Sequence, residues 1–599
     1  MTCHADTGDP GASHQVAAMG CRVCHLGDGS ADEPDDAHRG MVRFPGDLDV
    51  APRTCGTCHA AIVARVQSSS MNTGRGMVAV NRFAFGEQAT PDGDDTIADL
   101  GTSPADRHFR QLCIACHLGA SRLRQEPGGA SDDRPRRGGC AGCHLQVQPG
   151  QESGRDRGET PGSGHGRLVL HPDDEACSGC HSGSSRIALS YHGWYETTMS
   201  IDEARASRDP GRLRILDDGR VLAAMPADVH ADAGMACIDC HTPREVMGYG
   251  DRETGERPGP HRHGEQAIEI ACQDCHRTTP PETVSGDALD LESLTLIRLD
   301  PGLPRSDRAF VTTRRALALV NVVVPTSSGD RARDSAGDRA GAETPGSWLE
   351  VHEKHTGRIH RAGPPSLRCA SPGHERLACQ TCHAAWAPQC LGCHIRREPD
   401  GVFREYEGGF LAEPSTLAVR DNRIVPAVPG MIMTLDDGRG ERLVRLFAPI
   451  TPHTIRRRGR TCASCHRDPV ALGYGRGALE ITVPAGPRPE PGQPAEKGPY
   501  RLRPRYQALD DGLPADAWIA VLDGSDTPAG GRATRSDMRP LDVVEQRRVL
   551  RVGECLACHD GDERAIYGEF AAALEAMKPG CHRPGSAPGS PTRSPASSQ

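Results

Sequence analysis

The chemistry of this chain is concentrated in one repeated pattern, in which two cysteines are separated by two residues and followed at once by histidine. Every Cys-x-x-Cys in the 599-residue sequence has this histidine, and eleven complete copies are present. Thiolates are nucleophiles and soft ligands, and imidazole is the side chain that most often binds a metal. The copies are Cys21/Cys24/His25, Cys55/Cys58/His59, Cys113/Cys116/His117, Cys140/Cys143/His144, Cys177/Cys180/His181, Cys237/Cys240/His241, Cys272/Cys275/His276, Cys379/Cys382/His383, Cys390/Cys393/His394, Cys462/Cys465/His466 and Cys555/Cys558/His559.

This spacing is suited to the covalent attachment of haem. Two thiols three positions apart reach the two vinyl groups of one porphyrin, while the adjacent imidazole turns onto the iron as its proximal ligand. Zinc ribbons use their Cys-x-x-Cys motifs in pairs and do not need the histidine, and a thioredoxin-like redox site needs a single motif. We therefore expect eleven haem c groups, with a zinc or disulfide scaffold as the alternative.

Three cysteines lie outside the complete motifs. The chain opens Met-Thr-Cys-His, so a cysteine just before the first residue would make Cys3 and His4 a twelfth attachment site. Cys581 precedes His582 without a second cysteine in register, which we interpret as coincidence, and we interpret Cys369 as a free thiol or the relic of a lost site. No apolar signal segment is visible, so we expect a truncated start.

Fourteen further histidines are candidates for the distal ligand of an iron, and a surface position is the alternative for each. Several come a few residues before a motif, as His108 comes before Cys113. A supply of fourteen for eleven irons predicts mostly bis-histidine haems of low potential and leaves no obvious open iron. The candidates are His14, His38, His108, His165, His171, His192, His230, His261, His263, His352, His355, His360, His374 and His453.

The repeated motifs resemble those of the large multihaem c-type cytochromes of bacterial periplasms and outer cell surfaces. The resemblance covers nearly the whole chain as a motif pattern, and the close tandem pair in ACQTCHAAWAPQCLGCH, residues 378–394, is typical of that class. It implies rapid electron hopping between neighbouring haems. The chain lacks the Cys-x-x-Cys-Lys motif of the pentahaem nitrite reductases, and its likeness to octahaem hydroxylamine-oxidising or tetrathionate-reducing enzymes is confined to the shared motif.

The composition indicates that haem itself forms much of the core. Hydrophobic residues make up only 36% of the chain, while glycine and proline number 69 and 48. We expect the fold of a multihaem cytochrome c, in which mostly irregular chain and short α-helices wrap stacked haems, with small β-strand inserts. The net charge of −10 argues against a nucleic-acid partner. The longest apolar run, 316–325, is too short for a transmembrane segment.

Motif density divides the chain into segments. The expected segments are an N-terminal haem module 1–149 with four motifs and the truncated one, a linker 150–166, a second haem module 167–286 with three motifs, a strand-bearing insert and linker 287–347, a third haem module 348–476 with three motifs and a β insert at about 401–450, a C-terminal module 477–582 with one motif, and a disordered tail 583–599.

Local patterns between the motifs predict strands and one helix. Each motif itself is expected on a short helix or turn. Alternating or continuous apolar runs flanked by turn residues indicate strands, and an Asp-Gly between two such runs indicates a hairpin. These patterns predict a hairpin at 212–225, strands at 291–300 and 316–325, strands joined by a turn within 416–447, strands within 478–486 and 517–524, and a helix at 562–577.

These features favour an electron carrier over an enzyme, with no catalytic residue. We expect an exported protein, periplasmic or at the cell surface, acting in anaerobic or extracellular respiration. It would accept electrons from a membrane-associated, quinol-linked donor and pass them to other cytochromes or a terminal reductase. The sequence also permits assembly into a homo-oligomer or a haem filament. The alternative is a multihaem oxidoreductase that acts on a small nitrogen or sulfur compound at one open haem.

Overall fold

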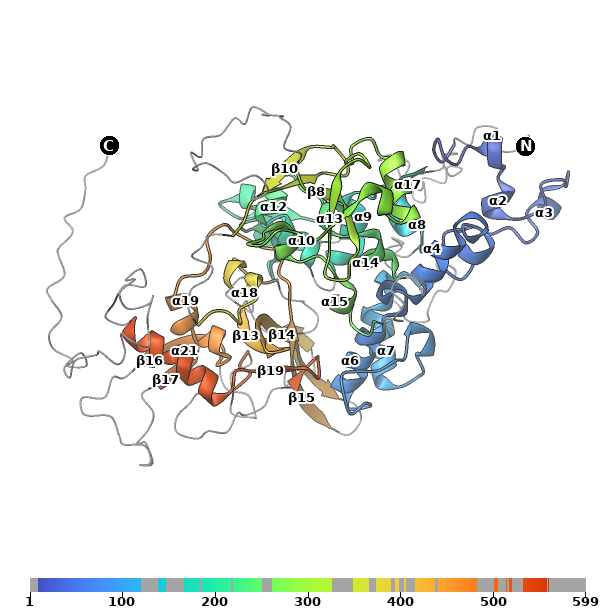
Figure 1. Cartoon of the computed structure of the whole chain (residues 1–599). Coiled ribbons are helices and arrows are strands. Elements are labelled where there is room, and N and C mark those ends of the chain that lie inside the picture. Colours follow the sequence, from blue (N-terminus) through green and yellow to red (C-terminus); the bar gives the residue numbers. More distant parts are fainter. Residues whose placement is uncertain are drawn as a thin grey trace, which may run out of the picture. The chain divides into compact units, whose positions relative to one another are not determined.

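The computed structural model divides the chain into two compact units, which are described separately here. Unit 1 comprises 1–366 together with 435–442, and unit 2 comprises 367–434 together with 443–599. Figure 1 shows the elements coloured along the chain. The structure describes residues 9–119, 138–146, 166–183, 186–216, 219–249, 261–325, 348–365, 373–388, 394–397, 403–405, 415–436, 440–481, 500–504, 513, 516–519, 532–556 and 559.

Unit 1 contains many short helices, and several begin at a side-chain cap. Ser103, for example, accepts a hydrogen bond from the backbone N–H of Asp106 at the start of α7. The helices are α1 Val16–Met19, α2 Arg22–His25, α3 Pro34–Ala37, η1 Ala51–Arg53, α4 Gly56–Ser68, α5 Ser70–Thr73, α6 Arg75–Phe85, η2 Ile97–Asp99, α7 Pro104–Leu112, η3 Ile114–Cys116, α8 Ala141–His144, α9 Asp174–His181, α10 Ile187–Tyr191, α11 Ile201–Arg205, η4 Pro210–Arg212, α12 Val229–Asp232, α13 Cys237–Cys240, α14 Pro243–Met247, α15 Gly264–Ala267, α16 Cys272–Cys275, η5 Gly286–Ala288 and α17 Leu291–Leu299.

The strands of unit 1 form three antiparallel sheets. The largest has five strands in the order β10-β9-β8-β7-β6, a second has the order β3-β5-β4, and β1 pairs with β2. The strands are β1 Leu145–Gln146, β2 Arg167–Leu168, β3 Trp194–Glu196, β4 Leu213–Ile215, β5 Val221–Ala224, β6 Thr283–Ser285, β7 Ala309–Thr312, β8 Ala318–Val323, β9 Leu349–His352 and β10 Ile359–Ala362.

The five-stranded sheet of unit 1 packs against two of the cysteine motifs. Its buried residues Val311, Leu319 and Val351 belong to an apolar cluster against which Cys240 and Cys275 pack. Apolar surface removed from water stabilises such a cluster by roughly 25 cal/mol per Å². The sheet therefore forms a rigid support for the motifs that begin at Cys237 and Cys272.

Unit 2 is built around a seven-stranded sheet. Its order is β12-β11-β14-β13-β19, and β15 pairs with both β14 and β18. A separate hairpin pairs β16 with β17. The elements are α18 Cys379–His383, α19 Ala463–His466, α20 Pro469–Leu472, α21 Val543–Cys555, β11 His394–Arg397, β12 Phe403–Glu405, β13 Thr416–Arg420, β14 Arg423–Asp436, β15 Glu441–Pro449, β16 Gly477–Ile481, β17 Tyr500–Pro504, β18 Arg532–Ala533 and β19 Met538–Pro540.

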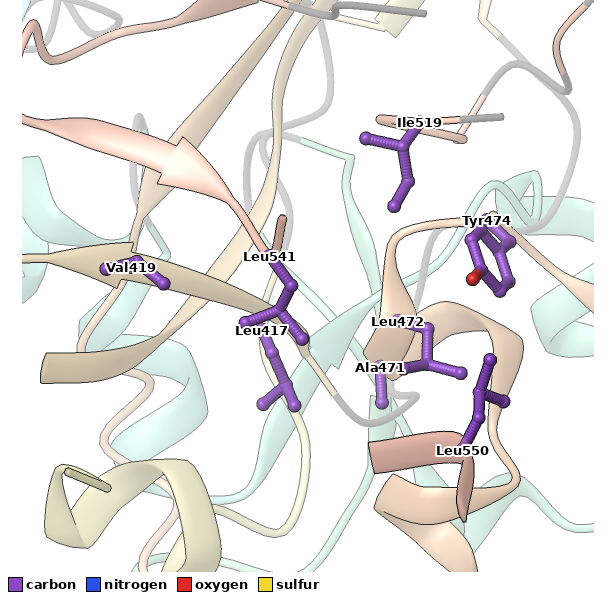
Figure 2. Packing of buried hydrophobic residues seen from close by; sticks show 8 residues of the cluster. All are labelled: Leu417, Val419, Ala471, Leu472, Tyr474, Ile519, Leu541 and Leu550. Atoms are coloured by element: carbon purple, nitrogen blue, oxygen red, sulfur yellow. The ribbon is translucent and has the colours of Figure 1, made fainter. Parts of the chain in front are cut away.

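A compact apolar cluster joins this sheet to the helices of unit 2. Figure 2 shows Leu417 on β13 beside Leu541, with Ala471, Leu472 and Leu550 gathered next to them. All five side chains are at most 4% exposed. Because Leu550 lies on α21 and Leu472 on α20, the cluster fixes both helices against the sheet.

Several predicted elements are confirmed, one is wrong, and the described part of another is not a strand. The hairpin at 212–225 is β4 and β5, and the run at 316–325 contains β8. The segment 416–447 contains β13, β14 and most of β15, and β16 overlaps 478–486. Residues 291–300, predicted as a strand, form the helix α17 instead. Residues 516–519 are not a strand, and the predicted helix at 562–577 and the tail lie outside the described residues.

Residues 291–299 form the helix α17 because of a helix cap that the strand-like apolar pattern made easy to overlook. Asp290 caps it by accepting a hydrogen bond from the backbone N–H of Ser293, and leucine and arginine have high helix propensity. Its residue Glu292 forms two hydrogen bonds of 2.6 and 2.8 Å with the guanidinium of Arg65. A local cap and an ion pair with a distant helix therefore outweigh the strand-like pattern.

No helix among the described residues combines the length and the apolar character that crossing a bilayer requires, as expected from the shortness of the apolar run at 316–325.

Candidate functional site

Most of the motifs that the structure describes lie on a single helical turn. Residues three apart lie on the same helix face, so the two thiols of a motif project together and the histidine follows them. The helices that carry or adjoin them are α2, α4, η3, α8, α9, α13, α16, α18, α19 and, for Cys555, α21. Within the described residues, the motif cysteines form no disulfides. The prediction of short helices or turns at the motifs is confirmed there, apart from the end of the last motif.

The two thiols of the second motif differ in burial. Cys55 packs against the buried Val63 and Val66, whereas Cys58, one turn later on α4, is exposed and its sulfur lies 3.9 Å from the hydroxyl of Thr57. Cys55 therefore contributes to the apolar cluster, while Cys58 lies at the surface.

His559 lies beyond its helix, because α21 ends at Cys555. This histidine is therefore not on the helical turn expected for its motif, but in a bend that follows the helix. Its backbone N–H still donates to the carbonyl of Cys555 at 2.9 Å, the spacing of one helical turn. The hydrogen bond keeps His559 next to the first cysteine of its motif after the helix has ended.

Motif histidines are oriented by hydrogen bonds from Nδ1 to backbone carbonyls. A carbonyl oxygen only accepts, so Nδ1 carries the proton in these rings and Nε2 keeps its lone pair. Metal-binding histidines characteristically have such a partner, which fixes the ring and its tautomer. The pairs are His25 with Val42 at 2.8 Å, His144 with Val169 at 2.9 Å, His276 with Gly363 at 2.9 Å, His383 with Arg456 at 3.0 Å and His466 with Val549 at 2.8 Å.

His241 has a carboxylate at this position instead. Its Nδ1 lies 3.2 Å from Oε2 of Glu245, one turn later on α14. Burial raises the pKa of Glu245, but the hydrogen bonds from His241 and from the backbone together lower it by more than burial raises it. The net shift of the pKa is therefore downward. Glu245 is therefore ionised at neutral pH.

Three motif histidines each face a candidate distal histidine. The ring centroids are 6.3 Å apart for His14 and His59, 6.2 Å for His230 and His276, and 6.0 Å for His374 and His466. The partners in these pairs are between 45 and 92 residues apart in the sequence, so the fold brings them together.

The separation of the ring centroids is compatible with an iron held between the two imidazoles. A metal–imidazole bond is about 2 Å long, so two such bonds on opposite sides, with the ring nitrogen to ring centre distance added on each side, give roughly 6 Å between centroids. The two ring planes share only the metal–nitrogen axis, which permits any angle between them, and the observed angles are 34°, 49° and 90°. The residues present therefore fit haem iron.

Further candidates have buried nitrogens that lack a hydrogen-bond partner. Nε2 of His108 is such an atom, while its Nδ1 lies 2.9 Å from Oδ1 of Asn81. Nε2 of His261 and of His352 are also buried without a hydrogen bond, the latter 3.8 Å from Glu350. Burial lowers the pKa of His108 and of His261, so both rings are neutral at pH 7, the form that binds metal.

In five other candidate distal histidines, Nε2 forms a hydrogen bond. That nitrogen cannot bind iron while the hydrogen bond persists. Carboxylates or a carbonyl accept from them. The pairs are His171 with Asp300 at 2.7 Å, His192 with Asp174 at 3.2 Å, His263 with Asp92 at 3.1 Å, His355 with the carbonyl of Pro172 at 3.3 Å and His360 with Glu353 at 2.6 Å. The structure thus separates these five candidates from those with an available Nε2.

The remaining predicted residues have less informative surroundings. His38 is exposed at the end of α3, and Nδ1 of His453 lies 2.8 Å from the carbonyl of Thr451. His394 begins β11. His165, Cys390, Cys393, Cys558, Cys3, His4, Cys369, Cys581 and His582 lie outside the described residues.

The motifs of unit 1 adjoin one another in a series. The thiols of Cys55 and Cys140 share a hydrogen bond, which lowers the pKa of Cys55 to about 6 and raises that of Cys140. The thiol of Cys180 donates to the carbonyl of Cys116 at 3.3 Å, which brings a further motif beside the series. Hydrogen bonds link Cys55 to Cys140 and Cys177 to Cys237, and electrostatic interactions link Cys24 to Cys55, Cys143 to Cys177 and Cys240 to Cys275.

Unit 2 has a shorter series. Burial raises the pKa of the Cys465 thiol, which also interacts with Cys382. On the other side, α21, which ends at Cys555, passes so close to His466 that a Cβ at Gly553 would lie 2.1 Å from the His466 carbonyl oxygen. Only glycine fits there, so the last motif is held beside its neighbour.

The described side chains do not assemble a conventional protein-only metal site. Among the residues that the structure describes, no three histidine, cysteine, aspartate or glutamate side chains converge to hold a metal ion. Structural zinc needs four such ligands. Haem brings four nitrogens of its own, so two protein imidazoles suffice.

Comparison with protein-family models, with curated proteins and with solved structures finds no match for the chain. Sequence reasoning missed the groups that orient the histidines. Two carry a usable signal, since Asp228 lies two residues before His230 and Glu245 four residues after His241.

Proposed function

We propose that this chain is a multihaem c-type cytochrome of the periplasm or cell surface that moves electrons along its attached haems. Haem supplies a one-electron iron couple when bound. The cysteine pairs anchor each porphyrin, the motif histidines bind the iron through Nε2, and His14, His230 and His374 close the second axial position of their partners.

The observation that carries the proposal is the series of adjoining motifs in unit 1. Thiols of successive motifs touch or interact, as at Cys55 with Cys140 and at Cys177 with Cys237. Cofactors attached to such neighbours lie close together, and closeness is what electron hopping needs. A protein that used each haem separately has no need of this arrangement.

The series can be tested by removing one link. In the full-length, haem-loaded protein, the pair C177A and C180A deletes an inner attachment site, and the pair C21A and C24A deletes an end one as the matched control. Each variant should lose one haem. We expect electron transport across an adsorbed protein film to slow markedly in the inner variant and little in the end variant; equal rates in the two would contradict transport along the series.

One observation favours a second candidate, a multihaem oxidoreductase with an open iron. Five of the fourteen candidate distal histidines have Nε2 engaged by an acceptor, which leaves nine for eleven irons. An iron without a second strong ligand can bind a small nitrogen or sulfur compound. Electron paramagnetic resonance of the oxidised protein distinguishes the two, because an open iron gives a high-spin signal and a closed one does not.

A further inference from the structure

Glu245 is a buried carboxylate with an unusual set of partners. Its side chain is 0% exposed. Oε2 accepts from Nδ1 of His241 at 3.2 Å and from the N–H of Thr242 at 2.9 Å. Oε1 accepts from the N–H groups of Glu269, at 2.5 Å, and Ile270, at 2.6 Å. The carboxylate therefore joins the motif that ends at His241 to the segment that leads into the next motif.

The geometry favours the ionised form of this group. Three of its four partners are backbone N–H groups, which only donate, so a protonated carboxyl would have no acceptor among them. With the carboxylate ionised, Nδ1 of His241 is the donor, and Nε2 is the ring nitrogen that would bind iron.

We infer that Glu245 is a positioning residue that gives His241 imidazolate character and so lowers the reduction potential of the haem attached at Cys237 and Cys240. A carboxylate on Nδ1 draws the proton away from the ring and makes Nε2 a more basic ligand. A more strongly donating ligand stabilises the ferric state, which has one electron fewer, over the ferrous state. The motif histidines whose Nδ1 bonds to a neutral carbonyl lack this effect.

The position in the series gives the lowered potential a consequence. Cys237 adjoins Cys177 on one side, and Cys240 adjoins Cys275 on the other. This inference rests on the proposed function. It places the haem of lowest potential inside the series, so that an electron passing along the series must move uphill in free energy at that point. Such a step slows passage between the two flanking haems and holds electrons on either side of it.

A redox titration followed by haem absorbance tests the inference. The test variant is Glu245→Gln in the full-length, haem-loaded protein. The matched control is Glu269→Gln, which removes an equally buried carboxylate that bonds to Thr313 and Arg315 rather than to a motif histidine. In E245Q, we expect one-eleventh of the absorbance change to titrate at a higher potential than in the wild type. The expected shift is at least a tenfold change in the reduction equilibrium constant, which is about 59 mV for one electron.

The outcomes separate this inference from the proposed function. A protein without haem refutes the proposed function. A fully haem-loaded E245Q whose titration superimposes on that of the wild type, or an E269Q shift as large as that of E245Q, overturns the role of Glu245 alone. If E245Q does not mature, the pair C237A and C240A serves instead. The component lost from the titration should then lie at the low end of the potential range, and a component lost from the high end overturns the inference.

Discussion

Replacing His230 by alanine should open one iron. His230 lies 6.2 Å from His276 between ring centroids, and its Nδ1 lies 2.8 Å from Oδ1 of the buried Asp228. The Nδ1 of His276 is held by the carbonyl of Gly363 at 2.9 Å, so both rings are fixed with Nε2 available. Removing one ring leaves that iron with a single strong protein ligand, and the iron becomes high-spin.

The size of the effect follows from the motif count. One iron among eleven changes, so the high-spin signal of His230→Ala should exceed that of the wild type by one spin per chain, measured by integrated electron paramagnetic resonance of the oxidised protein. The control is His192→Ala, because His192 is partly exposed and its Nε2 lies 3.2 Å from Asp174. An unchanged high-spin signal in H230A, or an equal gain in H192A, would refute the assignment of His230 as a ligand.

Three further predictions concern stability. Leu472→Ala, at a side chain 1% exposed, should destabilise unit 2 by about 2–5 kcal/mol in denaturant unfolding, and an effect below that range would contradict its place in the core. Lys354→Met should lower the free energy of unfolding by about 1–3 kcal/mol, because the buried ammonium donates to the carbonyl of Ile238 and the substitution leaves that carbonyl without a donor. Unchanged stability would exclude this hydrogen bond. Burial raises the pKa of Glu545, but hydrogen bonds, above all from Arg539, lower it to about 2. The resulting stabilisation is present above the pKa of glutamate in the unfolded chain, about 4.3, and is lost as the pH falls toward 2. In Glu545→Gln, the free energy of unfolding measured against pH should lack this part of the decrease.

The motifs and their short helices could be predicted because their information is local. Two cysteines and a histidine within five residues define the motif wherever the chain runs. The hairpin at 213–224 is equally local, because the sequence places Asp218-Gly219 between its two apolar runs. The helix at Leu291–Leu299 was missed because its apolar run resembles a strand and only the cap at Asp290 indicates otherwise.

The pairing of histidines and their orienting groups could not be predicted. His276 is held by a carbonyl at Gly363, 87 residues later, and any residue type supplies a carbonyl. His374 meets His466 only in the folded unit 2, since 92 residues separate them in the sequence. Such contacts depend on tertiary folding, whereas the residue types alone gave only a pool of candidates.

The central claim is that the motifs carry covalently bound haem, and counting the haem that stays with the denatured chain tests it most directly. The full-length protein, matured in a host that attaches haem c, would be unfolded in denaturant, separated from free haem and measured by absorbance against protein concentration. We predict eleven haems per chain, one for each complete motif. A chain that matures in such a host yet remains colourless, or one that releases all of its haem on unfolding, would contradict the account.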